Sequence, residues 1–182
     1  MNISELSDKI TLKVAAEAER LGGKIPYIPD SNGKYTDTDN ICWWTNGFWA
    51  GMLWQVYHAS GNELFRKTAE CSEKRLDAAL DGFENIDHDA GFLWLHTAGA
   101  NYRLTGNKRS ERRLMHAATL LAGRYNPVLE IIRAWDGQWM PGYDTAGGAI
   151  IDTMMNLPLL YLASEITGDS RFESIAERHA DT

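Results

Sequence analysis

Three short turns of one type recur along the chain and restrict what it can fold into. Each is a Ser or Thr followed by Gly and then by Asn or Asp: Ser60-Gly61-Asn62, Thr105-Gly106-Asn107 and Thr167-Gly168-Asp169. Glycine is preferred just past the end of a helix, where φ is positive. Asn and Asp are preferred as the N-cap that begins the next helix. Each triplet therefore predicts the turn of a hairpin made of two helices.

The segments on the two sides of these turns differ in a consistent way. The preceding segments, residues 48–54, 91–94 and 154–157, are rich in aromatic and small apolar side chains. The following segments, such as residues 63–67 and 108–113, are charged on one side. A helix that is apolar nearly all round is buried, whereas a helix with an apolar stripe lies at the surface. The pattern predicts one all-α domain, residues 1–182, with inner and outer rings of helices in a toroid of hairpins.

Local signals define further helices. Asn2 and Glu5 have the spacing of a capping box, and Gly22-Gly23 ends the apolar repeat that follows them. Residues 26–40 are rich in turn-forming residues and predict a loop. The apolar stripe of one outer helix consists of Phe65, Ala69, Ser72, Leu76 and Ala79. Strand signals are nearly absent, and the repeat lengths are too uneven for a helical solenoid.

Composition limits the partners and the location. The chain carries 25 acidic and 18 basic residues, a formal net charge of -7, and the basic residues form no stripe. This argues against nucleic acid or an anionic membrane as the main partner. No segment is apolar and long enough to span a membrane, and the N-terminus lacks a signal-peptide pattern. Cys42 and Cys71 lack metal-type or redox-type spacing, so we expect two reduced thiols in a cytoplasmic protein.

Asp152 is the strongest candidate for a catalytic group. It is the only charged residue between Asp144 and Glu165, in a segment that is otherwise mostly apolar. Burial raises the pKa of a carboxyl group toward the range in which it donates a proton near neutral pH. Asn156 follows one helical turn later on the same face, within reach of a hydrogen bond to Asp152. The alternative is an Asp152 buried to satisfy backbone groups near the start of its helix.

Asp89 is the second candidate, in the segment His88-Asp89-Ala90-Gly91-Phe92. Taken alone, an Asp in this position is expected to be the N-cap of a helix. His88 is adjacent and can donate a hydrogen bond, although an isolated histidine is more often structural.

Seven tryptophans are many for 182 residues, and four of them fall within one short segment. Aromatic faces can stack on the apolar faces of sugar rings. Trp49 and Trp54 are five residues apart on a predicted helix and are expected in the core. Trp44 precedes that helix and is expected to face a cavity. Trp135 and Trp139 lie in a loop that contains Gly and Pro, which favours a binding role.

Three blocks together resemble the unsaturated glucuronyl hydrolases, family 88 of the glycoside hydrolases. The blocks are Trp44-Thr45-Asn46-Gly47-Phe48-Trp49-Ala50-Gly51, His88-Asp89-Ala90-Gly91-Phe92 and Ile151-Asp152-Thr153-Met154-Met155-Asn156-Leu157. They occur in the family's order and at about its spacing. The resemblance implies an (α/α)6 barrel of which this chain is the N-terminal half. An open half-barrel exposes inner-helix surface, so we expect either a fragment of a longer chain or self-association.

The resemblance also implies a substrate and a mechanism. Family members act on short, lyase-generated oligosaccharides, such as glycosaminoglycan disaccharides, that end in a 4,5-unsaturated uronic acid. They hydrate the vinyl ether double bond, and the resulting hemiketal opens and releases the sugar. By position, Asp152 would protonate the double bond and then activate water, while Asp89 would bind ring hydroxyls. The expected substrate-binding set is Trp44, His88, Trp135 and Asn156. No metal or cofactor is implied.

Three alternatives remain open at the level of the sequence. Unsaturated rhamnogalacturonyl hydrolases share the fold and the chemistry and act on pectin fragments, but the block at residues 88–92 favours a glucuronyl hydrolase. A non-catalytic sugar-binding module would bind the unsaturated disaccharide without cleaving it. An all-helical, metal-dependent phosphohydrolase would use His58, His88, Asp89 and Asp152 as ligands. That last alternative leaves the tryptophans unexplained.

Overall fold

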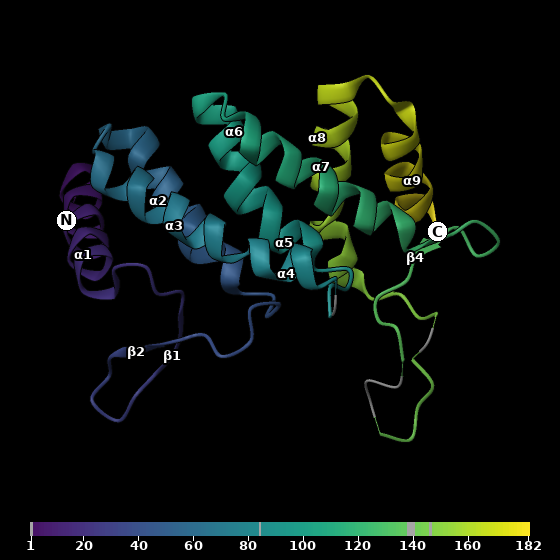
Figure 1. Cartoon of the computed structure of the whole chain (residues 1–182), viewed down its shortest axis with the longest axis horizontal. Coiled ribbons are helices and arrows are strands. Elements are labelled where there is room, and N and C mark those ends of the chain that lie inside the picture. The colour runs from purple at the N-terminus through teal and green to yellow at the C-terminus, as the bar shows by residue number, and fades with distance from the viewer. Residues whose placement is uncertain (1, 84, 138–140, 146) are drawn as a thin grey trace.

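The computed structural model describes residues 2–83, 85–137, 141–145 and 147–182. Nearly all regular structure in these residues is helical, which confirms the all-α prediction. The helices stand side by side in a row with the two chain termini at opposite ends (Figure 1). The row does not close on itself, so the molecule is an incomplete barrel.

Three helical hairpins follow a single N-terminal helix. The helices are α1 (Ile3–Leu21), α2 (Asn46–Ser60), α3 (Glu63–Arg75), α4 (Asp77–Gly82), α5 (Ala90–Trp94), the π-helical turn η1 (Leu95–Gly99), α6 (Ala100–Thr105), α7 (Lys108–Gly123), the 3-10 helix η2 (Ile151–Met155), α8 (Leu157–Thr167) and α9 (Ser170–Asp181). The hairpins pair α2 with α3, the continuous α5–η1–α6 segment with α7, and α8 with α9. The inner helices α2, α5 and α8 contact one another in sequence, and α1 packs on α3.

The three predicted turns are confirmed in detail. Gly61, Gly106 and Gly168 follow the ends of α2, α6 and α8 with φ of 67°, 71° and 71°. The side chains of Asn62, Asn107 and Asp169 accept hydrogen bonds from backbone N–H groups in the first turns of α3, α7 and α9. The same arrangement, a Gly followed directly by a capping side chain, therefore produces all three hairpins.

The core lies between the inner and the outer helices. Its larger cluster includes Leu93, Trp94, Leu114, Leu121, Leu159 and Leu160, all at most 1% exposed. The predicted stripe from Phe65 to Ala79 is buried, and so are Trp49 and Trp54, as expected for core residues. Gly47 allows α2 to cross α5 closely, since a Cβ atom at this position would lie 2.0 Å from the carbonyl oxygen of Phe92.

The loop predicted for residues 26–40 is only partly correct. It contains a short antiparallel pair, β1 (Pro26–Pro29) with β2 (Tyr35–Asp37), and a second pair joins β3 (Tyr125–Asn126) to β4 (Ile131–Ile132). The first pair is fixed by long-range contacts, because Asp37 accepts hydrogen bonds from the N–H of Ile25 and from Arg75 of α3. A local pattern does not contain these contacts.

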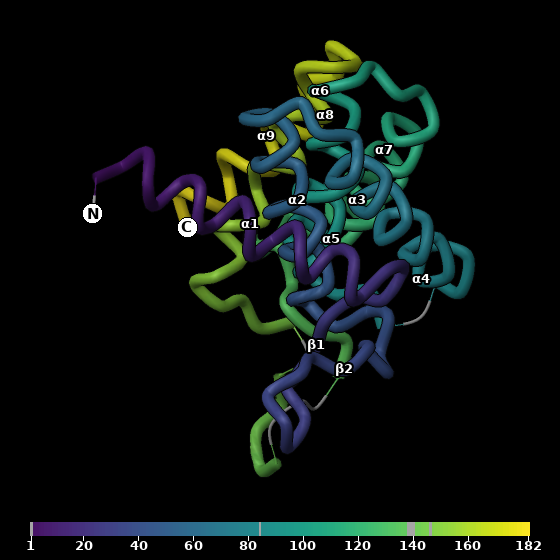
Figure 2. Tube along the Cα trace, turned by 90° about the vertical axis from the view of Figure 1, so that its left-hand side faces the viewer, coloured from purple at the N-terminus to yellow at the C-terminus, as the bar shows by residue number. Residues whose placement is uncertain are grey.

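Both views place the β1–β2 hairpin and residues 141–145, which precede η2, beyond the same end of the helices (Figures 1 and 2). At this end the inner helices α2, α5 and α8 begin. Of the helices described, none combines the length and the apolar character needed to cross a bilayer.

Candidate functional site

The predicted site residues gather where the inner helices begin. Trp44 lies two residues before α2, Asp89 occupies the N-cap position of α5, and Asp152 lies in η2, which leads into α8. Residues that are distant in sequence therefore meet at one end of the half-barrel.

His88 is at the centre of this group, with a side chain that is only 1% exposed. Its Nε2 atom lies 3.1 Å from Oδ1 of Asp152 and 3.4 Å from Oδ1 of Asp89. Its Nδ1 atom lies 2.9 Å from the carbonyl oxygen of Ala134. The imidazole thus connects the two carboxylates predicted to be catalytic with the loop that carries Trp135.

Asp89 is the more deeply buried of the two carboxylates, with a side chain that is 14% exposed against 44% for Asp152. Burial raises the pKa of Asp89 from its ordinary 3.8 to about 6. The positive charge of His88 opposes this rise, while the carboxylates of Asp87 and Asp152 add to it. Asp89 occupies the N-cap position of α5, as expected for an Asp at this point, but its side chain makes no capping hydrogen bond.

The expectation of a buried carboxyl at Asp152 is also wrong for this structure. Asp152 lies in a 3-10 turn before α8 rather than within a helix, and the neighbouring Ile151 and Met155 are 87% and 63% exposed. The reason is the open inner face, which leaves this turn without a covering layer. The desolvated acid that the sequence predicted at Asp152 is found at Asp89.

Asn156 has a different role from the one its position suggested. It is fully buried, its Oδ1 accepts a hydrogen bond of 2.8 Å from the N–H of Phe92, and its Nδ2 lies 3.4 Å from Oδ1 of Asp89. Its contact with Asp152 goes to the backbone carbonyl, also at 3.4 Å, and not to the carboxylate. The predicted substrate contact is therefore corrected to a link between the starts of α5 and α8.

The two predicted sugar platforms border the group. Trp44 is 41% exposed, and its ring packs on Phe48 and Phe92 with centroid distances of 5.9 and 5.8 Å. Trp135 is half-buried and meets the ring of His88 edge-on at 5.9 Å. Trp139, also expected to bind, lies outside the described residues.

Two further residues of the site were not predicted from the sequence. Arg124 is 9% exposed and donates to the carbonyl oxygens of Arg133 and Ala134 at 2.8 and 3.0 Å. Its Nη1 also pairs with the carboxylate of Asp136 at 3.1 Å. No local pattern marks such an arginine, because its acceptors lie in other segments of the chain. Asp87 accepts a hydrogen bond from the N–H of Asp89 at 2.9 Å, a turn that the two-residue spacing of these aspartates could have indicated.

The metal-site alternative does not match the geometry. Asp87, His88 and Asp89 can each bring one ligand atom within 4.8 Å of the others, but both ring nitrogens of His88 already face hydrogen-bond partners. His58, the other histidine that the phosphohydrolase pattern requires, is twelve residues along α2 from its first residue, about 18 Å at the helical rise. The four proposed ligands are therefore not gathered.

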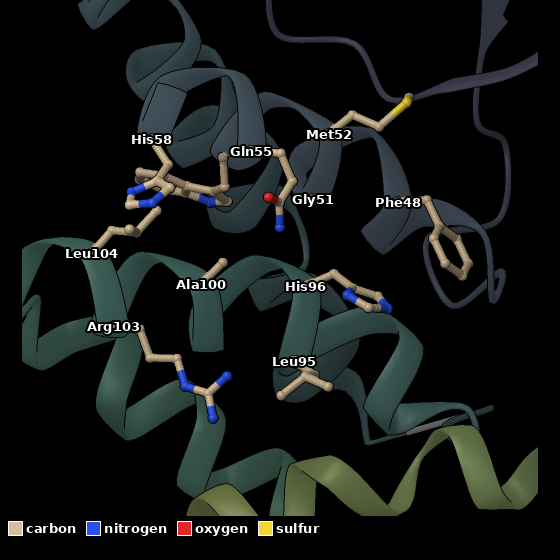
Figure 3. A pocket seen from close by; sticks show the side chains of 11 residues that line it. Phe48, Gly51, Met52, Gln55, His58, Leu95, His96, Ala100, Arg103 and Leu104 are labelled. Carbon is tan, nitrogen blue, oxygen red and sulfur yellow. The ribbon is translucent and has the colours of Figure 1, made fainter. Parts of the chain in front are cut away.

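A cavity of about 540 Å³ runs along the inner face between α2 and the α5–α6 segment (Figure 3). Phe48 and His96 line one end, where their rings lie 5.0 Å apart. His58, Arg103 and Leu104 line the other end. The aromatic wall of the candidate site is thus continuous with the open inner surface of the half-barrel.

Comparison with known proteins connects this geometry to a family, although no protein-family model matches the chain. The chain is 36% identical over 167 residues to the unsaturated glucuronyl hydrolase of Bacillus sp. (strain GL1). The aligned region covers 91% of this chain and 44% of that protein. It is 31% identical over 183 residues to the unsaturated chondroitin disaccharide hydrolase of Streptococcus agalactiae serotype III (strain NEM316). That aligned region covers 98% of this chain and 44% of that protein.

A solved structure agrees with these relatives. The crystal structure of the unsaturated glucuronyl hydrolase from Bacillus sp. GL1 matches with a TM-score of 0.84 at 35% identity, over 96% of this chain and 46% of that one. The chain thus spans a little under half of the length of the proteins it matches, in agreement with its open row of three hairpins. Sequence, fold and the resemblance of the three blocks all lead to one assignment: the chain belongs to the unsaturated glucuronyl hydrolase family.

Proposed function

We propose that the chain carries the acid and the substrate-orienting carboxylate of a glycoside hydrolase. The reaction releases a 4,5-unsaturated uronic acid from lyase-generated oligosaccharides, with glycosaminoglycan disaccharides as the preferred class. The observation that carries the proposal is the meeting of Asp89, His88 and Asp152 within hydrogen-bonding distance at the start of the inner helices. The relatives support the substrate class, since one of them is a chondroitin disaccharide hydrolase.

The two carboxylates take different roles because their exposure differs. Asp152, with 44% of its side chain exposed, is the one that a substrate can reach. It protonates C4 of the double bond, and its carboxylate then accepts a proton from the water that adds at C5. The resulting hemiketal opens and the sugar is released. Asp89, which is largely buried, binds ring hydroxyls and orients the ring.

The flanking side chains bind or position. Trp44 and Trp135 present partly exposed rings on which a sugar ring can stack. His88 and Asn156 are at most 1% exposed, so they act by holding the carboxylates and the start of α5 in place. All of these residues work without a metal ion or a cofactor.

The open inner face carries a second part of the proposal, namely self-association of the chain. Exposed apolar side chains occur on the inner segments, among them Met52, Leu104, Met155 and Tyr161. Exposed apolar surface of this kind favours association in water. The proposed location is the cytoplasm, where Cys42 and Cys71, which are not joined in a disulfide, would remain reduced. Analytical ultracentrifugation over a range of protein concentrations tests the association, which a purely monomeric chain would contradict.

The activity is tested by incubating the purified chain with an unsaturated chondroitin disaccharide. Loss of the absorbance of the conjugated double bond reports hydration, and the variant Asp152→Asn should abolish it. Asp81→Asn, which changes an exposed carboxylate of α4, is the matched control. An unsaturated rhamnogalacturonan disaccharide, run in parallel, separates the two related activities.

A binding measurement completes the experiment. Quenching of tryptophan fluorescence by the disaccharide, without turnover, would replace the hydrolase with a sugar-binding module. If the chain neither cleaves nor binds the disaccharide, the proposal for this chain is contradicted.

A further inference from the structure

The two ring nitrogens of His88 face partners of different chemistry. Nδ1 faces the carbonyl oxygen of Ala134 at 2.9 Å, and a carbonyl can only accept, so Nδ1 carries a proton. The same oxygen accepts from the backbone N–H of His88 at 3.3 Å and from Nη2 of Arg124 at 3.0 Å. Three donors therefore hold this carbonyl in place and fix the orientation of the imidazole.

Nε2, by contrast, faces two groups that cannot donate when they are ionised. Oδ1 of Asp152 and Oδ1 of Asp89 lie 3.1 and 3.4 Å away. A neutral imidazole protonated at Nδ1 would direct its Nε2 lone pair at two carboxylates, which is repulsive. A proton on Nε2 removes the repulsion and makes a charge-assisted hydrogen bond.

None of the other groups described around His88 supplies a proton between Nε2 and the two carboxylates. Oδ1 of Asp87 lies 3.9 Å from Nδ1, Trp135 offers the edge-on contact of its ring, and the guanidinium of Arg124 binds Ala134. The other buried imidazole nearby, that of His179, is occupied by a different contact, in which its Nδ1 accepts from the N–H of Ile132 at 3.0 Å.

We propose that His88 holds a proton on Nε2 that it transfers to Oδ1 of Asp152, so that Asp152 can act as the acid in the hydration step. This inference rests on the proposed function. The N–H bond of Nε2 breaks as the O–H bond of Asp152 forms, and the electron pair of the N–H bond stays on nitrogen. After Asp152 has protonated C4, the proton that it takes from water returns to Nε2. No further reactant is needed, and His88 is a positioning residue that acts through Asp152.

The arrangement has a structural reason. Because 44% of the Asp152 side chain is exposed, its proton is supplied by a neighbour rather than retained by desolvation. The buried imidazole is that neighbour. The hydrogen bond of its Nδ1–H fixes the ring so that Nε2, and not Nδ1, faces the carboxylates. Oδ1 of Asp89 lies 3.4 Å from the same Nε2, so a proton on this nitrogen faces two acceptors.

The test is nitrogen NMR of the histidine side chains in the complete chain, without substrate, at pH 7. His88 should carry protons on both nitrogens in the wild type, and the variant with Asp89→Asn and Asp152→Asn should lose the Nε2 proton and keep that on Nδ1. His179 is the internal control: because its Nδ1 accepts a hydrogen bond, its neutral ring should carry the proton on Nε2 in both proteins. A wild-type His88 without a proton on Nε2, or with an unprotonated Nδ1, would overturn the proposal.

A second variant tests the consequence for the reaction. His88→Gln can still donate to Ala134 but cannot carry a transferable proton, so kcat should fall at least about 100-fold with KM nearly unchanged. A loss of less than about threefold would overturn the transfer. Because the NMR measurement uses no substrate, its failure is distinguishable from a failure of the proposed function, which would appear as absence of turnover in the wild type.

Discussion

Gly91 packs so closely on Asn156 that a Cβ atom at this position would lie 2.5 Å from Cα and 2.6 Å from Oδ1 of Asn156. The contact is where α5 meets the start of α8, and it brings the N–H of Phe92 within hydrogen-bonding distance of Asn156. We expect Gly91→Ala to force these segments apart and to lower the free energy of unfolding by about 2 kcal/mol or more. Urea denaturation followed by circular dichroism measures this loss.

A matched glycine provides the control. Gly82 is in α4 and has open space around the position of a Cβ atom, so Gly82→Ala should leave stability unchanged or raise it slightly. Equal stability of the two alanine variants would contradict the close contact of α5 with α8.

Asn156 should also control the ionisation of Asp89. The substitution Asn156→Asp keeps an oxygen that can accept from the N–H of Phe92 but replaces the amide beside Asp89 with a second carboxyl. A like charge disfavours ionisation, so the pKa of Asp89 should rise above its value of about 6. Carbon NMR of the aspartate carboxyl groups over a pH titration measures the shift.

The corresponding control is Asn107→Asp. Asn107 caps α7 on the surface, and Asp is an equally good cap, so this variant should not change the pKa of Asp89. An unchanged or lower pKa of Asp89 in the Asn156→Asp variant would show that the two side chains are not neighbours.

Burial of Asp89 predicts a dependence of stability on pH. Its pKa of about 6 in the folded state is above the ordinary 3.8, so between these values the folded chain binds more protons than the unfolded one. The contribution of Asp89 to stability is therefore fully present below about pH 4 and is lost as the pH rises through 6. Relative to that of Asp89→Asn, the free energy of unfolding of the wild type should fall by about 2 kcal/mol between pH 4 and pH 7.

Urea unfolding of both proteins at several pH values isolates this effect, because the other carboxyl groups titrate in both. Asp81→Asn, at an exposed position, should follow the wild type at every pH. A stability difference between wild type and Asp89→Asn that stays constant with pH would rule out the raised pKa.

The hairpins could be predicted from the sequence because the information is local. A glycine with positive φ and a capping side chain at the next position decide each turn, as at Gly61 with Asn62. The strand pairs could not be predicted in this way, since β1–β2 is fixed by a contact between Asp37 and Arg75 of α3. Their residues are too few to form a period that a local pattern would reveal.

The candidate site, too, could be predicted only where the information is local in the sequence. The sequence identified Asp152 because it is the only charged residue in a mostly apolar segment, and it identified His88 and Asp89 through the resemblance of residues 88–92 to the family. It assigned burial to the wrong aspartate, because exposure depends on what covers the inner face and not on the neighbours in sequence. Arg124 was not identified, since its partners are the carbonyls of residues 133 and 134 and the carboxylate of Asp136, which only the fold brings next to it.

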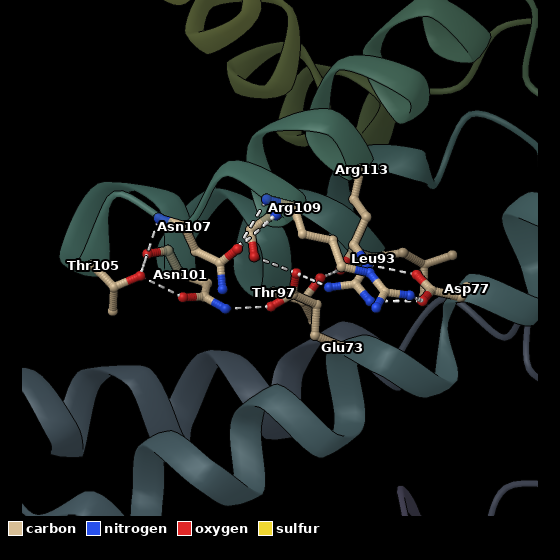
Figure 4. Close-up of polar contacts among 10 residues, drawn as sticks. Glu73, Asp77, Leu93, Thr97, Asn101, Thr105, Asn107, Arg109 and Arg113 are labelled. Atoms are coloured by element: carbon tan, nitrogen blue, oxygen red, sulfur yellow. Dashed lines mark hydrogen bonds and ion pairs between the residues drawn. The ribbon is translucent and has the colours of Figure 1, made fainter.

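Glu73 organises a buried polar network among the outer and inner helices (Figure 4). It is fully buried and accepts hydrogen bonds from Nδ2 of Asn101, Oγ of Ser110 and Nη1 of Arg113 at 2.7, 2.6 and 2.8 Å. The donors come from α6 and α7, so this one carboxylate of α3 joins three helices. The position could have been noticed in the sequence, since it lies four residues after Ala69 on the apolar stripe.

Removing this carboxylate should be among the most destabilising changes in the chain. Glu73→Ala leaves Arg113 with only Asp77 as its ionic partner and leaves the buried donors of Asn101 and Ser110 unsatisfied. We expect a loss of about 3 to 5 kcal/mol, measured as the free energy of unfolding in urea. The control Arg20→Ala removes a more exposed ion pair within α1 and should cost much less, because solvent screens such pairs. Similar losses for the two variants would mean that the network does not hold the helices together, and that apolar packing alone joins α3 to α6 and α7.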